Sequence, residues 1–191
     1  IYTLSLHDAL PIYFRMVERM LDGVKVRLNT DYFDLIKTEP NIAKKTVYTG
    51  CIDEFFGYQL GALQYRSVRF ETEELNEENY QGNAVVNYTE REVPYTRIIE
   101  HKHFEFGNQP TTVISREYST EWKLGMEPYY PVNDAVNGAL YAEYRKLSDA
   151  QNDVVFGGRL GQYRYYDMDQ VIKAALAAVH AELRVTGEGY V

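Results

Sequence analysis

The sequence predicts a mixed α/β fold in which an antiparallel β-sheet domain is inserted between two pieces of an α/β domain. Short apolar runs alternate with helical patterns near both ends of the chain, which is the order of elements in an α/β layer. Between them, residues 61–120 are rich in β-forming residues broken by polar turns, which favours an antiparallel sheet. The chain has 191 residues, 45% apolar and 25% charged, and this composition is that of a globular protein with ample core.

The elements of the first α/β piece follow from apolar periodicity. Residues 13–22 carry apolar side chains at helical spacing and end at Gly23, which predicts an amphipathic helix. Residues 24–28 alternate apolar with basic side chains, which predicts a strand. After a polar connection, residues 46–49 are a second predicted strand and residues 52–58 a helix.

The middle of the chain is expected to form the antiparallel sheet. Three β-rich segments lie between polar turns: residues 65–73, 84–89 and 111–118. In the first of them Val68 and Phe70 alternate with Arg69 and Glu71, as expected when one face of a sheet is packed and the other is wet. The wet face is available to a ligand.

The last part of the chain returns to the α/β pattern. Residues 133–147 have the apolar period of a helix, residues 154–156 that of a short strand, and residues 169–184 that of a final helix. The packed face of the first of these helices should carry four residues: Val136, Leu140, Tyr144 and Leu147.

The stretch from Gly157 to Ile172 joins that strand to the last helix. It holds a glycine turn, two arginines, three tyrosines and two aspartates. A helix start offers unpaired backbone N–H groups to an anionic ligand, so we expect this loop to face a ligand. Glycine followed by Asp167 and Asp169 is also ordinary helix-start chemistry, which leaves a helix-capping loop as the alternative.

Composition argues against several functional classes. The formal charge is -8 and no basic run occurs, so nucleic-acid binding is not expected. No apolar run approaches the ~20 residues of a membrane helix. The single cysteine, Cys51, fits a reducing compartment, so a cytoplasmic location is predicted. Eighteen tyrosines against eight phenylalanines favour a binding surface, because a core needs only the ring whereas a ligand site also uses the hydroxyl.

The first twelve residues, IYTLSLHDALPI, resemble the translated read-through of a sequencing adapter. They lack the starting methionine and basic region of a secretory signal. We therefore leave them out of the fold prediction and expect the chain to be the tail of a longer protein.

Three arginines are candidates for binding a phosphorylated ligand. An acidic protein must concentrate cations locally to hold such a ligand, and Arg97, Arg159 and Arg164 lie in aromatic or glycine-rich surroundings. The alternative for Arg97 is a strand-edge arginine paired at the surface with Glu92 or Glu100.

Tyr129 and Tyr130 are held in a restricted backbone by Pro128 and Pro131. Their hydroxyls are candidate donors to phosphate oxygens, and core packing is the alternative.

No metal site is predicted. His101 and His103, with Glu105, would share one strand face and could chelate a metal. Against this, Phe104 and Phe106 look like the buried alternation of that segment, and solvated histidines are common.

Other reactive patterns carry no function here. Cys51 has no nearby histidine base and is expected to be a buried small hydrophobe. Residues 87–89 fit a glycosylation acceptor, which we discount without a secretion signal. The motifs of serine hydrolases, zinc proteases, dithiol enzymes and P-loop proteins do not occur.

Five long motifs carry a resemblance to a known family: YTGCIDEFFGYQLGALQYRSVRFET, YQGNAVVNYT, PYTRIIEHKHFEFG, EPYYPVND and GGRLGQYRYYDMDQVI. With them the chain is similar to the C-terminal half of the bacterial UDP-galactopyranose mutases, from about residue 13 to about residue 183. The resemblance implies the C-terminal part of an FAD-binding Rossmann-like domain with an inserted antiparallel sheet domain. The implied segments are residues 13–60 and 121–191 for the FAD-binding part and residues 61–120 for the substrate domain. Residues 1–12 are expected not to be native because of the separate resemblance to adapter read-through.

The resemblance also implies site residues. Arg97 resembles the arginine that contacts the substrate diphosphate, and Tyr130 and Tyr165 resemble tyrosines whose hydroxyls bind it; these three are the catalytic candidates. Tyr129 is a further substrate-binding candidate. The implied FAD-binding residues are Val26, Gly50, Gly158, Arg159, Tyr166, Asp167 and Met168.

The implied activity is the interconversion of UDP-galactopyranose and UDP-galactofuranose by a cytoplasmic homodimer that uses reduced FAD, for cell-wall or surface polysaccharide. In the family's scheme the flavin N5 attacks the anomeric carbon and expels UDP, which is covalent catalysis with the cofactor as nucleophile. The family's glycine fingerprint, helical domain and mobile loop are not in this chain, so we expect the chain alone to be inactive. A non-catalytic nucleotide-sugar or glycan-binding module and a flavin amine-oxidase-like enzyme are the alternatives.

Overall fold

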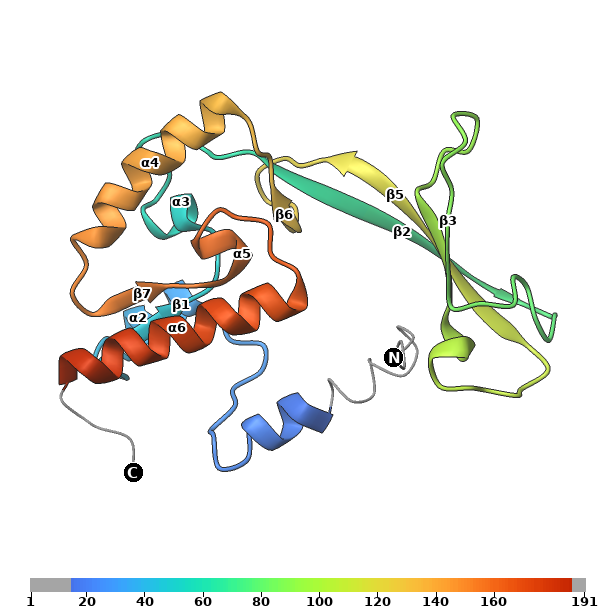
Figure 1. Ribbon diagram of the computed structural model, residues 1–191, viewed down its shortest axis with the longest axis horizontal. Helices are drawn as coiled ribbons and strands as arrows, with labels where there is room; N and C mark the ends of the chain where they lie inside the picture. Colours follow the sequence, from blue (N-terminus) through green and yellow to red (C-terminus); the bar gives the residue numbers. More distant parts are fainter. Residues whose placement is uncertain (1–14, 187–191) are drawn as a thin grey trace. The chain divides into compact units, whose positions relative to one another are not determined.

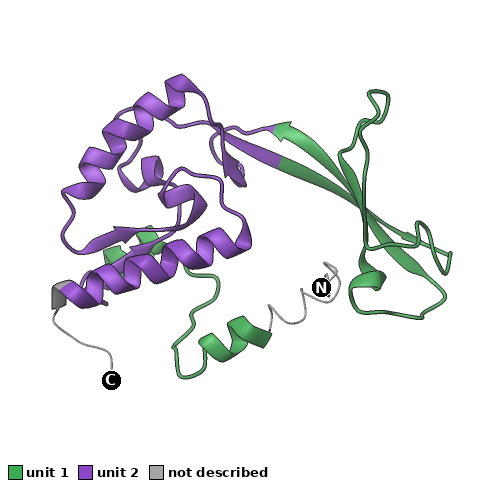
Figure 2. Ribbon diagram, viewed as in Figure 1, with its two compact units in different colours: residues 1–38, 68–120 green, residues 39–67, 121–191 purple. Residues whose placement is uncertain are grey.

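A computed structural model describes residues 15–186 of the protein (Figure 1). The chain divides into two compact units (Figure 2): Ile1–Thr38 with Val68–Thr120 form unit 1, and Glu39–Ser67 with Glu121–Val191 form unit 2. The strands make one parallel pair and one antiparallel sheet, accompanied by helices, which confirms the predicted mixed α/β class. The predicted adapter-derived segment, residues 1–12, lies outside the described residues.

In unit 2, β1 (Thr46–Tyr48) and β7 (Val154–Phe156) form the parallel pair, with Val47 opposite Val155. Helices α4 (Ala135–Asp149) and α6 (Met168–Thr186) lie on opposite sides of this pair (Figure 1). The Asp134 carboxylate caps α4 by accepting a hydrogen bond from the backbone N–H of Asn137 at 2.7 Å. Both strands and both helices were predicted, because each has a clear apolar period.

The core of unit 2 is aromatic and surrounds the short helix α3 (Ile52–Phe55). Six buried residues form its centre: Cys51, Ile52, Leu63, Tyr65, Tyr144 and Tyr163. The buried Asp53 carboxylate accepts hydrogen bonds from the Leu63 N–H at 2.8 Å and the Tyr65 hydroxyl at 2.7 Å, so it is satisfied without a cation. Burial raises the pKa of the Cys51 thiol to about 12, and the thiol is the buried small hydrophobe that was predicted.

The antiparallel sheet has the strand order β3-β4-β5-β2-β6. Its strands are β2 (Tyr65–Leu75), β3 (Val85–Asn87), β4 (Arg97–Glu100), β5 (Thr112–Glu121) and β6 (Tyr130–Pro131). Ile98 and Ile114 are fully buried on the packed face of unit 1. The segments of β2, β3 and β5 were predicted, whereas β4 was not.

The predicted strand at residues 24–28 is wrong. These residues form no regular element, and Val24, Val26 and Leu28 are all exposed. A strand needs a hydrogen-bonded neighbour, and no strand among residues 15–186 pairs with this segment. The preceding helix is confirmed within the described residues, where residues 15–20 are helical and Gly23 follows with a φ of 75°.

Three further differences are local. Helix α2 (Tyr32–Thr38) occupies a segment predicted as a polar connection, and its signal is Asp31, whose carboxylate accepts the Asp34 N–H at 3.0 Å. The segment η1 (His101–Phe104) is a 3₁₀ helix, so the predicted strand face at His101 and His103 is wrong. Val136 is 78% exposed and does not share the packed face of α4 with Tyr144.

No helix within residues 15–186 is long and apolar enough to cross a membrane.

Candidate functional site

The candidate site is built on the segment that leaves β7 and enters α6. After β7 the chain makes one helical turn, α5 (Gly158–Gly161), and an irregular loop follows. Gly158 has a φ of 72°, which favours glycine, and a Cβ added at Gly161 would lie 2.9 Å from the backbone oxygen of Tyr48. These two glycines therefore let the turn approach β1 closely.

Arg159 fixes the loop that follows this turn. Its Nε donates to the backbone oxygen of Tyr166 at 2.8 Å, and its guanidinium carbon lies 4.8 Å from the centre of the Tyr165 ring. The Tyr166 hydroxyl in turn donates to the Gln162 side chain at 2.7 Å. The loop is thus held by its own side chains, with the Tyr165 ring stacked on the arginine.

Tyr165 meets Tyr130, which lies on β6. The two ring centres are 5.9 Å apart and the rings are nearly perpendicular, at 88°. Neither hydroxyl has a hydrogen-bond partner within residues 15–186. The structure therefore brings together two predicted diphosphate-binding tyrosines and the predicted Arg159, with both hydroxyl groups available to a ligand.

Tyr129 directly precedes β6. Its N–H donates to the backbone oxygen of Arg66 at 2.9 Å, which continues the pairing of β6 with β2. Tyr130 is the member of this tyrosine pair whose ring contacts Tyr165.

Arg97 lies in unit 1, at the start of β4, whereas the other catalytic candidates lie in unit 2. Its Nε is 3.0 Å from Oε1 of Glu117 on β5, not from Glu92 or Glu100, the partners considered from sequence. Glu117 also accepts a hydrogen bond from the Thr96 hydroxyl at 2.9 Å. The Arg97 side chain is 44% exposed, so an anion can reach its guanidinium.

Sequence reasoning missed two neighbours of Arg97. Glu117 holds Arg97 from β5, and Asn87, directly opposite Arg97 on β3, lies on the same face of the sheet. Only the strand register reveals these neighbours, because nothing in the local sequence links them to Arg97.

The residues implied for FAD binding divide between the two units. Gly50, Gly158, Arg159 and the residues that start α6 belong to unit 2, whereas Val26 lies in the irregular segment of unit 1. A Cβ added at Gly50 would lie 2.5 Å from the Tyr48 hydroxyl oxygen, so packing within the chain already requires a small residue there. Asp167 and Met168 are exposed at the start of α6.

Arg164 does not join Arg159. Its guanidinium carbon lies 5.3 Å from the centre of the Tyr166 ring. Arg164 also lines a cavity of about 680 Å³, together with Tyr141 and Tyr163. Arg159 is not among the lining residues of that cavity.

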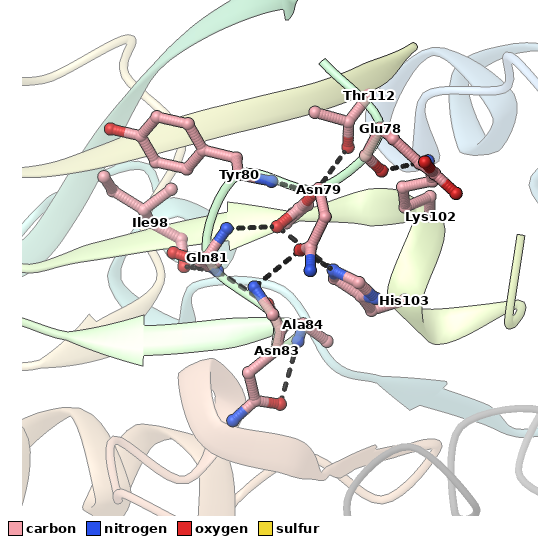
Figure 3. Close-up of polar contacts among 12 residues, drawn as sticks. Glu78, Asn79, Tyr80, Gln81, Asn83, Ala84, Ile98, Lys102, His103 and Thr112 are labelled. Atoms are coloured by element: carbon pink, nitrogen blue, oxygen red, sulfur yellow. Dashed lines mark hydrogen bonds and ion pairs between the residues drawn. The ribbon is translucent and has the colours of Figure 1, made fainter. Parts of the chain in front are cut away.

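His103 belongs to a polar cluster of unit 1 that anchors a loop (Figure 3), whereas Nε2 of His101 lies 2.8 Å from the Ser115 hydroxyl. The fully buried Glu100 carboxylate accepts the N–H groups of Tyr80 and Gln81, and Nε2 of His103 lies 3.1 Å from it. Burial alone would raise the pKa of Glu100, but the backbone donors and the Thr112 hydroxyl hold it below its ordinary value. No group of three metal-ligating side chains occurs in the described part of the chain.

Comparison with known proteins shows the family of this chain. A family model described as UDP-galactopyranose mutase matches residues 2–165. The "probable UDP-galactopyranose mutase" of Klebsiella pneumoniae is 37% identical over 167 residues, which cover 86% of this chain and 42% of the relative. The UDP-galactopyranose mutase of Mycoplasma pneumoniae is 40% identical over 142 residues, covering 71% of this chain and 35% of the relative.

A third relative carries a different name. The dTDP-fucopyranose mutase of Escherichia coli is 37% identical over 130 residues, which cover 68% of this chain and 34% of the relative. The chain therefore spans between 34% and 42% of the length of these three relatives.

The family match begins within residues 1–12, whose interpretation as adapter-derived stays a prediction. It extends over far more than half of the chain and includes β1 through β7 and the loop that carries Arg159 and Tyr165. The chain belongs to the UDP-galactopyranose mutase family.

Proposed function

We propose that this chain is the C-terminal part of a flavin-dependent isomerase that interconverts UDP-galactopyranose and UDP-galactofuranose. The observation that carries the proposal is the contact of Tyr130 with Tyr165 beside Arg159, in a chain of this family. Two hydroxyl donors on one small surface suit the oxygens of a diphosphate.

The work of these residues is to hold UDP while the sugar changes its ring. The bond between the anomeric carbon and the diphosphate breaks and re-forms, so negative charge develops on the departing oxygen. Tyr130 and Tyr165 donate hydrogen bonds to the diphosphate. Arg97 stays in the proposal as the diphosphate arginine that the family resemblance implies. This local charge is needed because the formal charge of the chain is -8.

The donor set at the carboxyl ends of β1 and β7 supports FAD as the cofactor. Ligands of open α/β sheets bind at this edge. Arg159 and the exposed Asp167 offer a cation and an acceptor, and the first turn of α6 at Met168 offers backbone N–H groups. When bound, reduced FAD would supply a nucleophile for the anomeric carbon. For Val26, the proposal is a contact with the adenine end of FAD, which the family resemblance implies.

We propose that the 191-residue chain alone neither retains FAD nor turns over. It spans 42% of the Klebsiella relative, and apolar side chains that border the groove between α6 and the β1–β7 pair, such as Val47 and Val179, are exposed. An isolated chain that purifies yellow and converts the sugars would contradict this.

The proposed activity is tested in the longer protein that carries this chain. The protein is reduced with dithionite and incubated with UDP-galactofuranose, and the nucleotide sugars are separated by chromatography. Conversion to UDP-galactopyranose without any oxidised product supports the mutase. Flavin reduction by an amine would support the amine-oxidase alternative, and UDP-sugar binding without flavin the non-catalytic module.

The substrate is tested in parallel, because one relative is named a dTDP-fucopyranose mutase. The same assay with dTDP-fucopyranose should give slower conversion than with the UDP sugars. We further propose a cytoplasmic homodimer whose product serves cell-wall or surface polysaccharide, as the family resemblance implies. Light scattering of the longer protein tests the dimer.

A further inference from the structure

We propose that Tyr163 is a positioning residue of this site, because its buried hydroxyl ties the loop that carries Tyr165 to the strand that carries Tyr130. The inference rests on the proposed function, since the two tyrosines that it aligns are the proposed diphosphate donors. Tyr163 was not among the site residues expected from the sequence, and in this proposal it does not touch the ligand itself.

The Tyr163 hydroxyl forms a bridge to the two backbone segments that flank the β2–β6 pair. It donates to the backbone oxygen of Gln64 at 2.5 Å and to that of Val132 at 3.1 Å, so one proton is shared between two acceptors. Gln64 directly precedes β2, and Val132 directly follows β6. Burial raises the pKa of the Tyr163 hydroxyl to about 12, so the hydroxyl keeps its proton and remains a donor at neutral pH.

This bridge lies two residues from each of the site tyrosines. Val132 is two residues after Tyr130 on one side, and Tyr163 is two residues before Tyr165 on the other. All four residues belong to unit 2, and the Tyr130 and Tyr165 rings meet with their centres 5.9 Å apart. With so short a span on both sides, a shift of the loop at the bridge changes the position of one hydroxyl donor relative to the other.

The backbone at Tyr163 has a conformation that favours glycine. Tyr163 has a φ of 44° and follows α5 in a Schellman motif, in which its N–H donates to the Leu160 oxygen at 3.4 Å and the Arg164 N–H to the Arg159 oxygen at 2.9 Å. This position is usually a glycine, because a side chain is strained there. Residues held in such strained backbone cluster at functional sites. A glycine would form the same turn but has no side chain to reach the β2–β6 pair.

Two neighbouring rings hold the Tyr163 side chain in its place. The Tyr141 ring on α4 stacks on it with the ring centres 5.6 Å apart, and the Tyr65 ring on β2 meets it edge-on at 5.5 Å. The side chain is only 6% exposed. Replacing Tyr163 with phenylalanine keeps these ring contacts and removes the bridging hydroxyl alone.

Removal of the hydroxyl leaves neither backbone acceptor without a donor. The Gln64 oxygen also accepts the Val132 N–H at 3.0 Å, and the Val132 oxygen also accepts the Asp134 N–H at 3.1 Å. The large cost of an unpaired buried acceptor therefore does not arise. We expect Tyr163→Phe to fold, with a small fall of the thermal midpoint.

The test is a double-mutant cycle of Tyr163→Phe and Tyr165→Phe in the longer protein, with UDP as the probe. Isothermal titration should show UDP binding about fivefold weaker in Tyr163→Phe than in the wild type, because the Tyr165 hydroxyl is no longer held in position. In the Tyr165→Phe background that hydroxyl is already absent, so adding Tyr163→Phe should weaken UDP binding by less than about twofold. A residue that serves only the stability of the core would weaken binding equally in both backgrounds.

The matched control is Tyr144→Phe. Tyr144 is another buried tyrosine of the unit 2 core, and its hydroxyl donates to the backbone oxygen of Gly61 at 2.7 Å. This variant should also have a lower thermal midpoint, but it should bind UDP as the wild type does. A loss of UDP affinity in Tyr144→Phe equal to that in Tyr163→Phe would assign the effect to a loosened core and overturn the positioning role.

The outcomes separate this inference from the proposed function, with binding measured at a temperature at which all variants are folded. A wild type that converts the sugars, together with unchanged UDP affinity in Tyr163→Phe or an equal loss in both backgrounds, overturns the role of Tyr163 alone. A wild type that binds UDP but converts no sugar overturns the proposed function, while the cycle still reports whether Tyr163 acts through Tyr165. A wild type that binds no UDP overturns both.

Discussion

Replacing Arg97 with alanine in the longer protein should remove most mutase activity while the sheet of unit 1 stays folded. Arg97 begins β4, its side chain is exposed, and its Nε lies 3.0 Å from Oε1 of Glu117. An exposed ion pair of this kind contributes little to the stability of the sheet.

The structure sets the expected size of two effects, the loss of stability and the loss of turnover. The Arg97 side chain is 44% exposed, and an exposed ion pair contributes about 0–1 kcal/mol to the free energy of unfolding. Glu117 also keeps the Thr96 hydroxyl as a donor, so its carboxylate is not left without a partner. Loss of a preorganised donor to developing charge costs about 2.7–4 kcal/mol of activation free energy, or about 10²–10³ in kcat.

The assay follows sugar conversion by the dithionite-reduced enzyme, with flavin content read from visible absorbance and stability from urea unfolding. The control is Arg69→Ala, because Arg69 is also exposed and ion-paired, with Glu71, in unit 1. Arg69→Ala should show the same small stability loss with unchanged turnover. Turnover near the wild-type rate in a folded, flavin-loaded Arg97→Ala variant would refute the reasoning.

Three other predictions concern single side chains. Tyr165→Phe removes one hydroxyl donor and should weaken UDP binding by about 1.5–3 kcal/mol in titration calorimetry, and an unchanged affinity would exclude a hydrogen bond to the diphosphate. Gly158→Ala forces a Cβ into a backbone with φ of 72° and should cost about 1–2 kcal/mol in urea unfolding, whereas an unshifted midpoint would show that the loop relaxes. The pKa of Glu100 is lowered on folding, because its backbone and hydroxyl donors outweigh the burial that would raise it. The contribution of ionised Glu100 to stability is therefore complete above its ordinary pKa of 4.5 and is lost as the pH falls below that value. In Glu100→Gln the thermal midpoint should fall less steeply as the pH is lowered. An equally steep fall in the variant would contradict this.

The errors in the fold prediction show where local sequence is insufficient. The apolar alternation of residues 24–28 is as regular as that of β1, yet only β1 forms a strand, because only β1 has a partner, β7, among the described residues. The strand β4 was missed because its few residues gain their partners only from β3 and β5. His101 and His103 were placed on a strand face, but the chain coils into the 3₁₀ helix η1 at that point.

The sequence by itself determined the fold class, the long helices α4 and α6, the glycine turn after β7 and, through its long motifs, the family. These features depend on the order and spacing of residues along the chain. Only the tertiary structure decided that Tyr130 meets Tyr165, that Glu117 holds Arg97, and that Arg66 lies opposite Tyr130. Strand register and loop packing bring together residues that are far apart in sequence, and no local pattern records which residues will be opposite each other.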